Sequence, residues 1–574
     1  MKLRPMFKVG RVPLALFAAF AIAALPLGYG AHPVHAGNSS THSHINCAAN
    51  ATECTEVYDS EAVFGEGVYV GHDEPSLLFY SPTPGSGNSD TYRLTLPKDP
   101  PVQPKQDGTG GTFNFQLRPA FWFGMAMCDS QSAPLPGTPC TADTDANIFN
   151  STNPASAKYI GKHPGSAFME MQFYPPGWVA WPPGNSCDAT KWCAALNIDS
   201  LSENMNTGRF NNTTCRNLVG DEYVNFAFIT KNGVAQAPAN PVDSTGATFT
   251  PDPTKDLFMS SGDTLTVDLH DTSAGFQVVI NDLTTGQSGL MTASAANSFG
   301  QVQFDPTGTS CHNIPYNFHP MYSTSSPDTR VLWAAHSYNI AYSDEIGHFE
   351  YCNAVSSEGG NCTSAGVNDP SGLDSDDNYC FDAAASLSVP TTGCFSIFSG
   401  GENDFDGPEY QHNWPGSNPN PTADAQVHAT PVTFTSPLFT GPGNSGLRNY
   451  KQAAFENDLP RIEGTDFSPN NNCQRHVSNP ADPNPGSGCV DPPNGASFYP
   501  IYSTASVNGS CAWEEGDAHL PNATNTFGGT PTAEYGELLL LSYPAAGNTI
   551  TQRFNDFHST LGNNPCPAPG GQGG

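Results

Sequence analysis

Hydrophobic residues in this chain alternate with polar residues over short stretches, and long amphipathic helical patterns are scarce. In the segment 262–291, apolar residues occupy every second position from 265 to 269 and again from 276 to 280. A period of two packs one face of a strand against a core and leaves the other in water. The segment therefore predicts a β-hairpin whose wet face carries Asp268 and His270, and both are candidates for substrate binding.

A second alternating stretch covers residues 167–173 and predicts a strand. Its methionines point to one face, while Glu170 and Gln172 share the other, wet face about 6.7 Å apart. A carboxyl group beside an amide donor can protonate a leaving group or stabilise developing charge, so both residues are catalytic candidates. A polar outer face with a hydrophobic rim explains the same pattern without catalysis. The aromatic residues that follow are candidate rings for stacking on sugars: Tyr174, Trp178 and Trp181.

The distribution of strand patterns predicts several regions along the chain. Residues 61–355 hold most of the strand signals and predict a large β-sandwich domain. Residues 356–430 are rich in Asp, Asn, Gly and Ser and predict a long insertion or linker. Strand patterns resume over 431–566, which predicts a second, smaller β domain. A polar lead over 37–60 and a disordered tail over 567–574 complete this division.

A short signature occurs twice and relates the two β regions. Residues 320–324 read Pro-Met-Tyr-Ser-Thr and are followed by Glu-Ile-Gly at 345–347. Residues 500–504 read Pro-Ile-Tyr-Ser-Thr and are followed by Glu-Tyr-Gly at 534–536. The smaller unit is therefore predicted to be related in structure to part of the larger one.

The first 36 residues have the pattern of an export signal, because a basic start and a short apolar run precede a small-residue cleavage site. An uncleaved anchor is the alternative, but the apolar run is below the ~20 residues that cross a bilayer. We expect a secreted protein, extracellular or at the cell surface. Removing the signal's four basic residues takes the formal net charge from −33 to −37. That charge disfavours nucleic acid and membrane partners and suits an acidic medium, where protonated carboxyls relieve self-repulsion.

All 16 cysteines follow the signal, and an even number in an exported chain predicts disulfides. No Cys-x-x-Cys pair is present, which disfavours metal binding by cysteine. Three pairs lie close enough in sequence to staple loops: Cys128 with Cys140, Cys187 with Cys193, and Cys473 with Cys489.

Two acidic loops have the character of calcium sites. Asp374, Asp376 and Asn378 alternate in one loop, and Asp404 and Asp406 precede a glycine in the other. Alternating oxygen ligands and a glycine for a sharp turn are what Ca²⁺ requires. A solvated acidic loop explains both patterns equally well. We expect any bound calcium to be structural, and the sequence indicates no catalytic cofactor.

Four segments resemble, in the same order, motifs of the eqolisins, which are glutamic peptidases secreted into acid. Residues 173–175 are similar to the family's aromatic-Tyr-Pro strand end, and 261–267 to its Gly-Asp strand opening. Residues 282–288 resemble its Asn-Leu-Thr-Thr-Gly-Gln-Ser turn, and 344–347 its Asp-Phe-Gly before the closing strand. The resemblance implies a concanavalin-like β-sandwich over about a third of the chain, and a peptidase with Glu170 and Gln172 at its centre.

The chain departs from that family at the residues of its catalysis. The family's catalytic Glu lies between the Thr-Thr-Gly-Gln-Ser turn and the closing strand, but residues 289–343 contain no Glu. The family's catalytic Gln lies upstream of the Tyr-Pro strand, where this chain has Gln116 without the surrounding motif. The resemblance therefore supports the predicted fold more strongly than it supports glutamic-peptidase chemistry.

The closing segment 344–350 supplies a second carboxylate candidate. Strand alternation places His348 and Glu350 on one face. A glycosidase needs two carboxyl groups about 5 Å apart for retention, or about 6.5–9.5 Å for inversion. Glu170 with Glu350 is the predicted pair, and His348 is a further catalytic candidate.

These patterns together predict a mostly β protein: a concanavalin-like antiparallel β-sandwich with a smaller related C-terminal unit and long disulfide-stapled loops. The predicted function is that of a secreted hydrolase of an extracellular polymer, and a glycan is the favoured substrate. A glutamic-peptidase-like acid endopeptidase and a non-catalytic surface or glycan-binding protein remain as alternatives. Phosphate-binding loops, Gly-x-Ser-x-Gly elbows and His-Glu-x-x-His motifs are absent from the sequence, which disfavours nucleotide enzymes, α/β-hydrolases and common zinc proteases.

Overall fold

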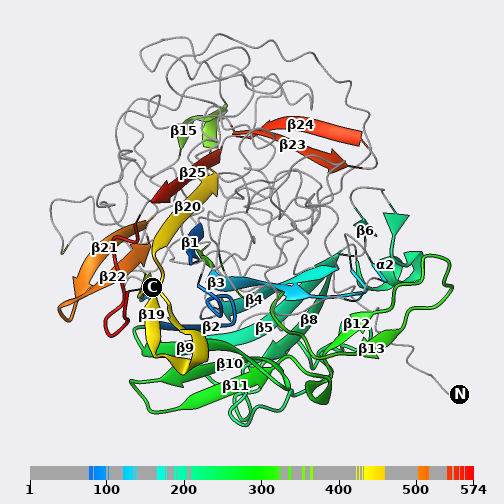
Figure 1. Ribbon diagram of the computed structural model, residues 1–574, viewed down its shortest axis with the longest axis horizontal. Coiled ribbons are helices and arrows are strands. Elements are labelled where there is room, and N and C mark those ends of the chain that lie inside the picture. The colour runs from blue at the N-terminus through cyan, green and yellow to red at the C-terminus, as the bar shows by residue number, and fades with distance from the viewer. Residues whose placement is uncertain are drawn as a thin grey trace, which may run out of the picture.

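The computed structural model of this 574-residue chain describes residues 76–81, 83–98, 101, 121–132, 136–137, 139, 165–174, 176, 187–188, 190–201, 203–204, 209–220, 222–321, 323, 325, 334–337, 352–355, 362–365, 422, 426, 430, 432–458, 502–515, 539–545, 548–554, 556–561 and 563–573. In this part of the chain the protein is mostly β, and every pairing between its strands is antiparallel. Two large sheets contain most of the strands (Figure 1). The mostly β prediction is confirmed.

The first sheet has eight strands. Their bounds are β1 (Ser76–Tyr80), β3 (Phe121–Cys128), β4 (Ser166–Tyr174), β5 (Cys193–Leu201), β8 (Glu222–Phe228), β14 (Ala334–Ser337), β20 (Gln452–Asp458) and β25 (Asp556–Leu561). They are ordered β25-β20-β1-β14-β3-β4-β5-β8 across the sheet. Strand β4 therefore pairs with β3 on one side and with β5 on the other, near one end of the sheet.

The second sheet has nine strands. Their bounds are β2 (Ser89–Thr95), β9 (Thr264–Thr272), β10 (Gly275–Asp282), β11 (Ser288–Thr292), β17 (Val432–Phe434), β18 (Leu438–Thr440), β19 (Leu447–Asn449), β21 (Tyr502–Val507) and β22 (Ser510–Glu515). The main path runs β11-β10-β9-β2-β17-β22-β21, and β18 joins β2 to β19.

Shorter elements surround the two sheets. Four further pairs are β6 (Glu203–Asn204) with β7 (Arg209–Phe210), β12 (Gly300–Val302) with β13 (Asn313–Pro315), β15 (Cys352–Val355) with β16 (Cys362–Ala365), and β23 (Leu539–Ala545) with β24 (Asn548–Phe554). Helical elements within the described residues include α2 (Thr213–Val219), η2 (Ala295–Asn297) and η7 (Pro442–Asn444). Among the residues described above, no helix is long and apolar enough to cross a membrane.

The core lies between the two sheets, which pack face to face. The ring centroids of Tyr92 on β2 and Phe123 on β3 are 4.4 Å apart, and those of Phe79 on β1 and Trp513 on β22 are 6.4 Å apart. All four side chains are buried. Figure 1 shows β3, β4, β5 and β8 lying over β9, β10 and β11. Burial of aromatic rings from both layers supplies the main stabilisation of such a sandwich.

The predicted hairpin at 262–291 is confirmed in its strands and faces. Strands β9 and β10 pair from Gly275 opposite Thr272 to Asp282 opposite Leu265. Along β9 the residues at 265, 267 and 269 are buried, and those between them are half-buried. The turn that follows β10 is held by Asp282, whose carboxylate accepts hydrogen bonds from the backbone N–H groups of Thr284 and Thr285 at 2.9 and 3.0 Å.

Most of the described C-terminal strands add to the two large sheets, while β23 and β24 form a pair of their own. In the eight-stranded sheet, β20 pairs with β1 and β25 pairs with β20. In the nine-stranded sheet, β17 pairs with β2 and β22 pairs with β17. These strands come from the region 431–566, for which the sequence predicts a second, smaller β domain, and they share their sheets with strands of the region 61–355. The alternating pattern that marked this region also suits strands that add to an existing sheet.

The prediction of a disordered tail over 567–574 is also wrong for the part that the structure describes. Asn449 accepts a hydrogen bond from the backbone N–H of Ala568 at 2.7 Å and donates one to its carbonyl oxygen at 3.2 Å. The backbone of Gln572 exchanges hydrogen bonds with Leu447 and Asn449 at 2.9 and 3.0 Å. A disulfide from Cys566 to Cys511 on β22 fixes the start of this tail.

Three disulfides join described residues: Cys187–Cys193, Cys215–Cys311 and Cys511–Cys566. The predicted pair Cys187–Cys193 is thereby confirmed, and it staples the segment after β4 to the start of β5. Cys128 is also disulfide-bonded. The predicted partners Cys140, Cys473 and Cys489 lie outside the described residues.

Candidate functional site

Strand β4 carries the two catalytic candidates on the face that points away from the nine-stranded sheet, which we call the outer face. Met169, Met171 and Phe173 are fully buried, and the Phe173 ring lies 6.2 Å from the core residue Phe123. Alternation then places Glu170 and Gln172 on the outer face. The strand and its two faces agree with the sequence prediction.

A chain of hydrogen bonds connects polar side chains along this face. The Gln172 Nε2 donates to Glu170 Oε2 at 2.5 Å, and the Tyr174 hydroxyl donates to Gln172 Oε1. From β5, Asn197 Nδ2 donates to the Tyr174 oxygen at 3.4 Å. Asn197 lies directly opposite Glu170 in the strand register. The structure therefore joins Glu170 and Gln172 as a carboxylate–amide dyad with two further polar groups behind it.

On its other side, Glu170 faces a strand position without a side chain. Gly124 on β3 is directly opposite Glu170 in the register. A Cβ atom at Gly124 would lie 2.4 Å from Cζ of Phe168, so the Phe168 ring occupies the space above the glycine. The half-buried Glu170 thus has the amide of Gln172 as a hydrogen-bond partner and a glycine opposite it on β3.

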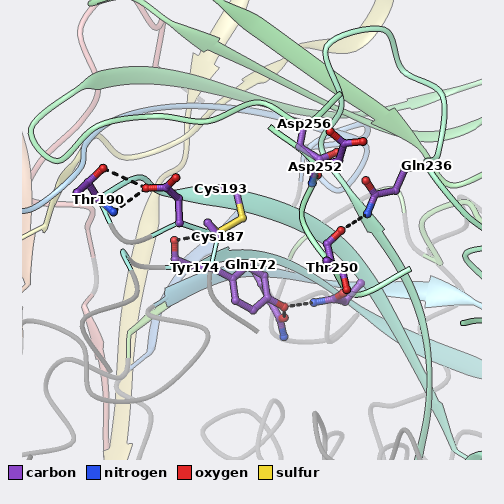
Figure 2. Close-up of a disulfide and its surroundings, with 11 residues drawn as sticks. Gln172, Tyr174, Cys187, Thr190, Cys193, Gln236, Thr250, Asp252 and Asp256 are labelled. Atoms are coloured by element: carbon purple, nitrogen blue, oxygen red, sulfur yellow. Dashed lines mark hydrogen bonds between the residues drawn. A yellow bond between two sulfur atoms is a disulfide. The ribbon is translucent and has the colours of Figure 1, made fainter. Parts of the chain in front are cut away.

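An aromatic cluster and a disulfide hold Tyr174. Its ring centroid is 6.3 Å from that of Phe226 and 6.5 Å from that of Phe228, both on β8. Cys193 lies directly opposite Tyr174, and its disulfide partner Cys187 places Sγ 3.5 Å from the Tyr174 carbonyl oxygen. Figure 2 shows Tyr174 and Gln172 beside this disulfide. The position of the hydroxyl is therefore fixed by packing.

The outer face is not the open, wet face that the sequence predicts. Gln172 is 7% exposed and Tyr174 is 3% exposed. The connection from β8 to β9 (residues 229–263) covers this end of the sheet, because Phe249 packs against Phe226 with ring centroids 5.0 Å apart. The interpretation of Tyr174 as a sugar-stacking ring is therefore wrong: its ring is enclosed by other aromatic side chains.

The two candidates on the β9 hairpin lie on the far side of the sandwich. Asp268 and His270 alternate with core residues of the nine-stranded sheet and point outward from it. Asp268 Oδ1 accepts a hydrogen bond from Thr91 Oγ1 on β2 at 2.7 Å. Both sheets and the core separate these residues from Glu170, so the structure does not bring the two groups together.

The remaining candidates fall on residues that the structure does not describe. They are the catalytic candidates His348 and Glu350, the aromatic candidates Trp178 and Trp181, and the calcium candidates Asp374, Asp376, Asn378, Asp404 and Asp406. Within the described ranges, no group of three or more His, Cys, Asp or Glu side chains is arranged to hold a metal ion.

A buried aspartate that the sequence analysis missed joins several elements at the end of β3. Asp129 is fully buried, and its carboxylate accepts hydrogen bonds from Ser132 at 2.6 Å, Ser200 at 2.8 Å and Gln301 at 2.8 Å. It also accepts one from the backbone N–H of Gln131 at 2.9 Å. Burial raises the pKa of Asp129, and the hydrogen bonds oppose that rise. Because both oxygens are satisfied and enclosed, this network is structural.

A second missed aspartate lies in the core itself. Asp90 on β2 is 1% exposed, and neither carboxyl oxygen has a hydrogen-bond partner in the described part of the chain. Tyr450 is close, but its hydroxyl donates to the carbonyl oxygen of Ser86 at 2.5 Å. Burial raises the pKa of Asp90 well above its ordinary value, and Tyr450 lowers it in part. An alternating pattern gives no signal for an acid in a core position.

Comparison with known proteins found no matching family model, no similar curated protein and no similar solved structure. The chemistry of the site must therefore be argued from its geometry. A carboxylate that accepts a short hydrogen bond from a primary amide can accept a proton, and the amide can stabilise negative charge.

Proposed function

We propose that this chain is a secreted hydrolase of an extracellular polymer that works in acid and uses Glu170 and Gln172 as its reacting pair. The observation that carries the proposal is the 2.5 Å hydrogen bond from Gln172 Nε2 to Glu170 Oε2 on one face of β4. Peptide bonds are the favoured substrate, because a carboxylate–amide dyad suits the hydrolysis of a planar carbonyl group. We further propose that the two antiparallel sheets form a concanavalin-like sandwich.

The dyad divides the reaction into two proton transfers. Glu170 takes a proton from a water molecule while the water oxygen bonds to the carbonyl carbon and an electron pair moves onto the carbonyl oxygen. The second N–H of the Gln172 amide stabilises this negative charge. Glu170 then returns the proton to the leaving nitrogen as the C–N bond breaks. The same residues need no second carboxylate, which the glycosidase alternative requires.

The strongly negative charge supports an acidic working medium. The chain has a formal net charge of −33 at pH 7, and acid lowers the self-repulsion that this charge causes. Asp90 favours the same medium, because burial raises its pKa and its carboxyl oxygens have no hydrogen-bond partner among the described residues.

The test is incubation of the purified protein with denatured casein and with a polysaccharide panel, at pH 3 and at pH 7. We expect cleavage of casein at pH 3 and a loss of at least about hundredfold in Glu170→Gln. Glu514→Gln on β22 is the matched control, because it makes the same change on a strand of the other sheet. Casein cleavage that survives in Glu170→Gln would refute the dyad, and cleavage of polysaccharide alone would favour a glycosidase.

A further inference from the structure

The hydrogen-bond chain on the outer face has one direction. The Tyr174 hydroxyl has a single hydrogen, which it donates to Gln172 Oε1, so it can only accept from Asn197. Asn197 must therefore present its NH₂ group to Tyr174. With Oε1 of Gln172 occupied, Nε2 faces Glu170. Every donor in the chain points toward the Glu170 carboxylate.

The groups at the far end of this chain are buried. Asn197 is 2% exposed and Tyr174 is 3% exposed. The Tyr174 ring packs among Phe226, Phe228 and the Cys187–Cys193 disulfide. This packing holds the Tyr174 oxygen beside Gln172 Oε1. Because a carbonyl oxygen can only accept, the hydroxyl must be the donor of this hydrogen bond, and that donation sets the direction of the chain.

We infer that Tyr174 is a positioning residue that locks the Gln172 amide with its N–H toward Glu170, and that Asn197 supports it. This inference rests on the proposed function of the dyad and adds the protonation state in which the dyad works. A carboxylate that accepts a hydrogen bond is favoured in its ionised form, and donors aligned in one direction strengthen one another. Glu170 therefore enters the reaction as the base.

This hydrogen bond from Tyr174 to Gln172, which we call the Tyr174 lock, matters because a primary amide can face a carboxyl group in two ways. With Nε2 toward Glu170, the ionised carboxylate is stabilised. With Oε1 toward Glu170, the carboxyl must be protonated in order to donate. Without the Tyr174 hydroxyl, acid would select the second arrangement, and the base would be lost at a higher pH than in the intact protein.

The first variant is Tyr174→Phe, which keeps the ring packing and removes only the hydroxyl. We expect the acidic limb of the pH–rate profile to move up by about one pH unit, with roughly tenfold lower kcat on that limb. Tyr92→Phe is the matched control, because Tyr92 is a buried core tyrosine whose hydroxyl has no hydrogen-bond partner among the described residues. Asn197→Leu is a second variant, and it should shift the profile in the same direction by less.

A readout that does not need activity separates this inference from the proposed function. The titration of the Glu170 carboxyl carbon, followed by NMR in the full-length protein, should move to higher pH in Tyr174→Phe and stay in place in Tyr92→Phe. If the wild-type protein cleaves no polymer but the Glu170 titration still shifts in Tyr174→Phe, the proposed function is refuted, while the positioning role of Tyr174 is supported. If Glu170→Gln abolishes cleavage while Tyr174→Phe changes neither titration nor profile, the lock is refuted and the function stands.

Discussion

Gly124 lies directly opposite Glu170 on the neighbouring strand, and the position of a Cβ atom at Gly124 is taken by the ring of Phe168. Glycine in a strand interior ordinarily costs stability, because it adds no packing and loses more entropy on folding. Here it leaves room for the tip of an aromatic ring opposite the candidate base.

Gly124→Ala should therefore destabilise the protein instead of stabilising it. The added methyl group would lie 2.4 and 2.9 Å from atoms of the Phe168 ring, so that ring must move. We expect a loss of about 1–3 kcal/mol in the free energy of unfolding, measured with urea. In a Phe168→Leu background the same change should cost much less. Equal costs in the two backgrounds would show that the ring does not require the glycine.

Buried aspartates should make the protein more stable in acid than at neutral pH. Burial raises the pKa of Asp256 from 3.8 to about 6. The folded state then binds more protons than the unfolded state between these values, so stability is full below about pH 3.8 and falls as pH rises through about 6. The contribution of Asp256 is at most on the order of 3 kcal/mol.

Asp256→Asn tests this contribution directly. The variant keeps an oxygen that can accept the hydrogen bond now made by the backbone N–H of Asp252 at 2.7 Å. Urea unfolding at pH 3 and pH 7 should show little change at pH 3 and higher stability than wild type at pH 7. Asp243→Asn, at an exposed position, is the control and should change neither. A variant that is less stable than wild type at pH 7 would contradict the assignment.

The Cys187–Cys193 disulfide should matter more to the site than to overall stability. It closes a short loop, with a sequence separation of 6, so its removal should cost only about 2 kcal/mol. Cys215–Cys311 has a separation of 96, and its removal should cost about 4–5 kcal/mol. We expect the double serine variant at 187 and 193 to lose the Tyr174 lock and show the shifted pH profile. The variant at 215 and 311 should unfold more easily but keep the profile.

The ordered tail gives a prediction about the C-terminus. Asn449→Ala removes both side-chain hydrogen bonds to the backbone of Ala568. We expect a loss of about 1–3 kcal/mol, together with faster amide exchange over 567–573, measured by hydrogen exchange and mass spectrometry. Arg448→Ala, at the adjacent and less buried position, is the comparison. Unchanged exchange in Asn449→Ala would mean that the disulfide at Cys566 alone holds the tail.

The sequence predicts elements whose residues contact each other locally. The β9–β10 hairpin follows from alternation, because both strands and the turn between Thr272 and Gly275 lie within about 20 residues. The faces of β4 also follow from alternation. Whether a face is exposed to water does not follow from alternation. Phe249 and Phe258, which pack against the cluster around Tyr174, lie far along the chain from β4.

The site was predictable only in part, because some of its contacts join residues that are far apart in the sequence. Glu170 and Gln172 are two residues apart on one strand, so their contact is local. The contribution of Asn197 depends on the register between β4 and β5, and no sequence pattern fixes that register. Asp90 is a polar residue at a core position, which contradicts the alternation rule and can be found only in three dimensions.

The pairing of β1 with β20 determines when this molecule can finish folding. One edge of β1, at residues 76–80, has its partner in residues 452–458, and the next strand in the sheet comes from 556–561. The start of the sandwich therefore waits for nearly the whole polypeptide to be synthesised. Contacts so distant in sequence form slowly. The eight-stranded sheet, which carries Glu170 and Gln172, therefore cannot close its last pairing until residue 561 has left the ribosome.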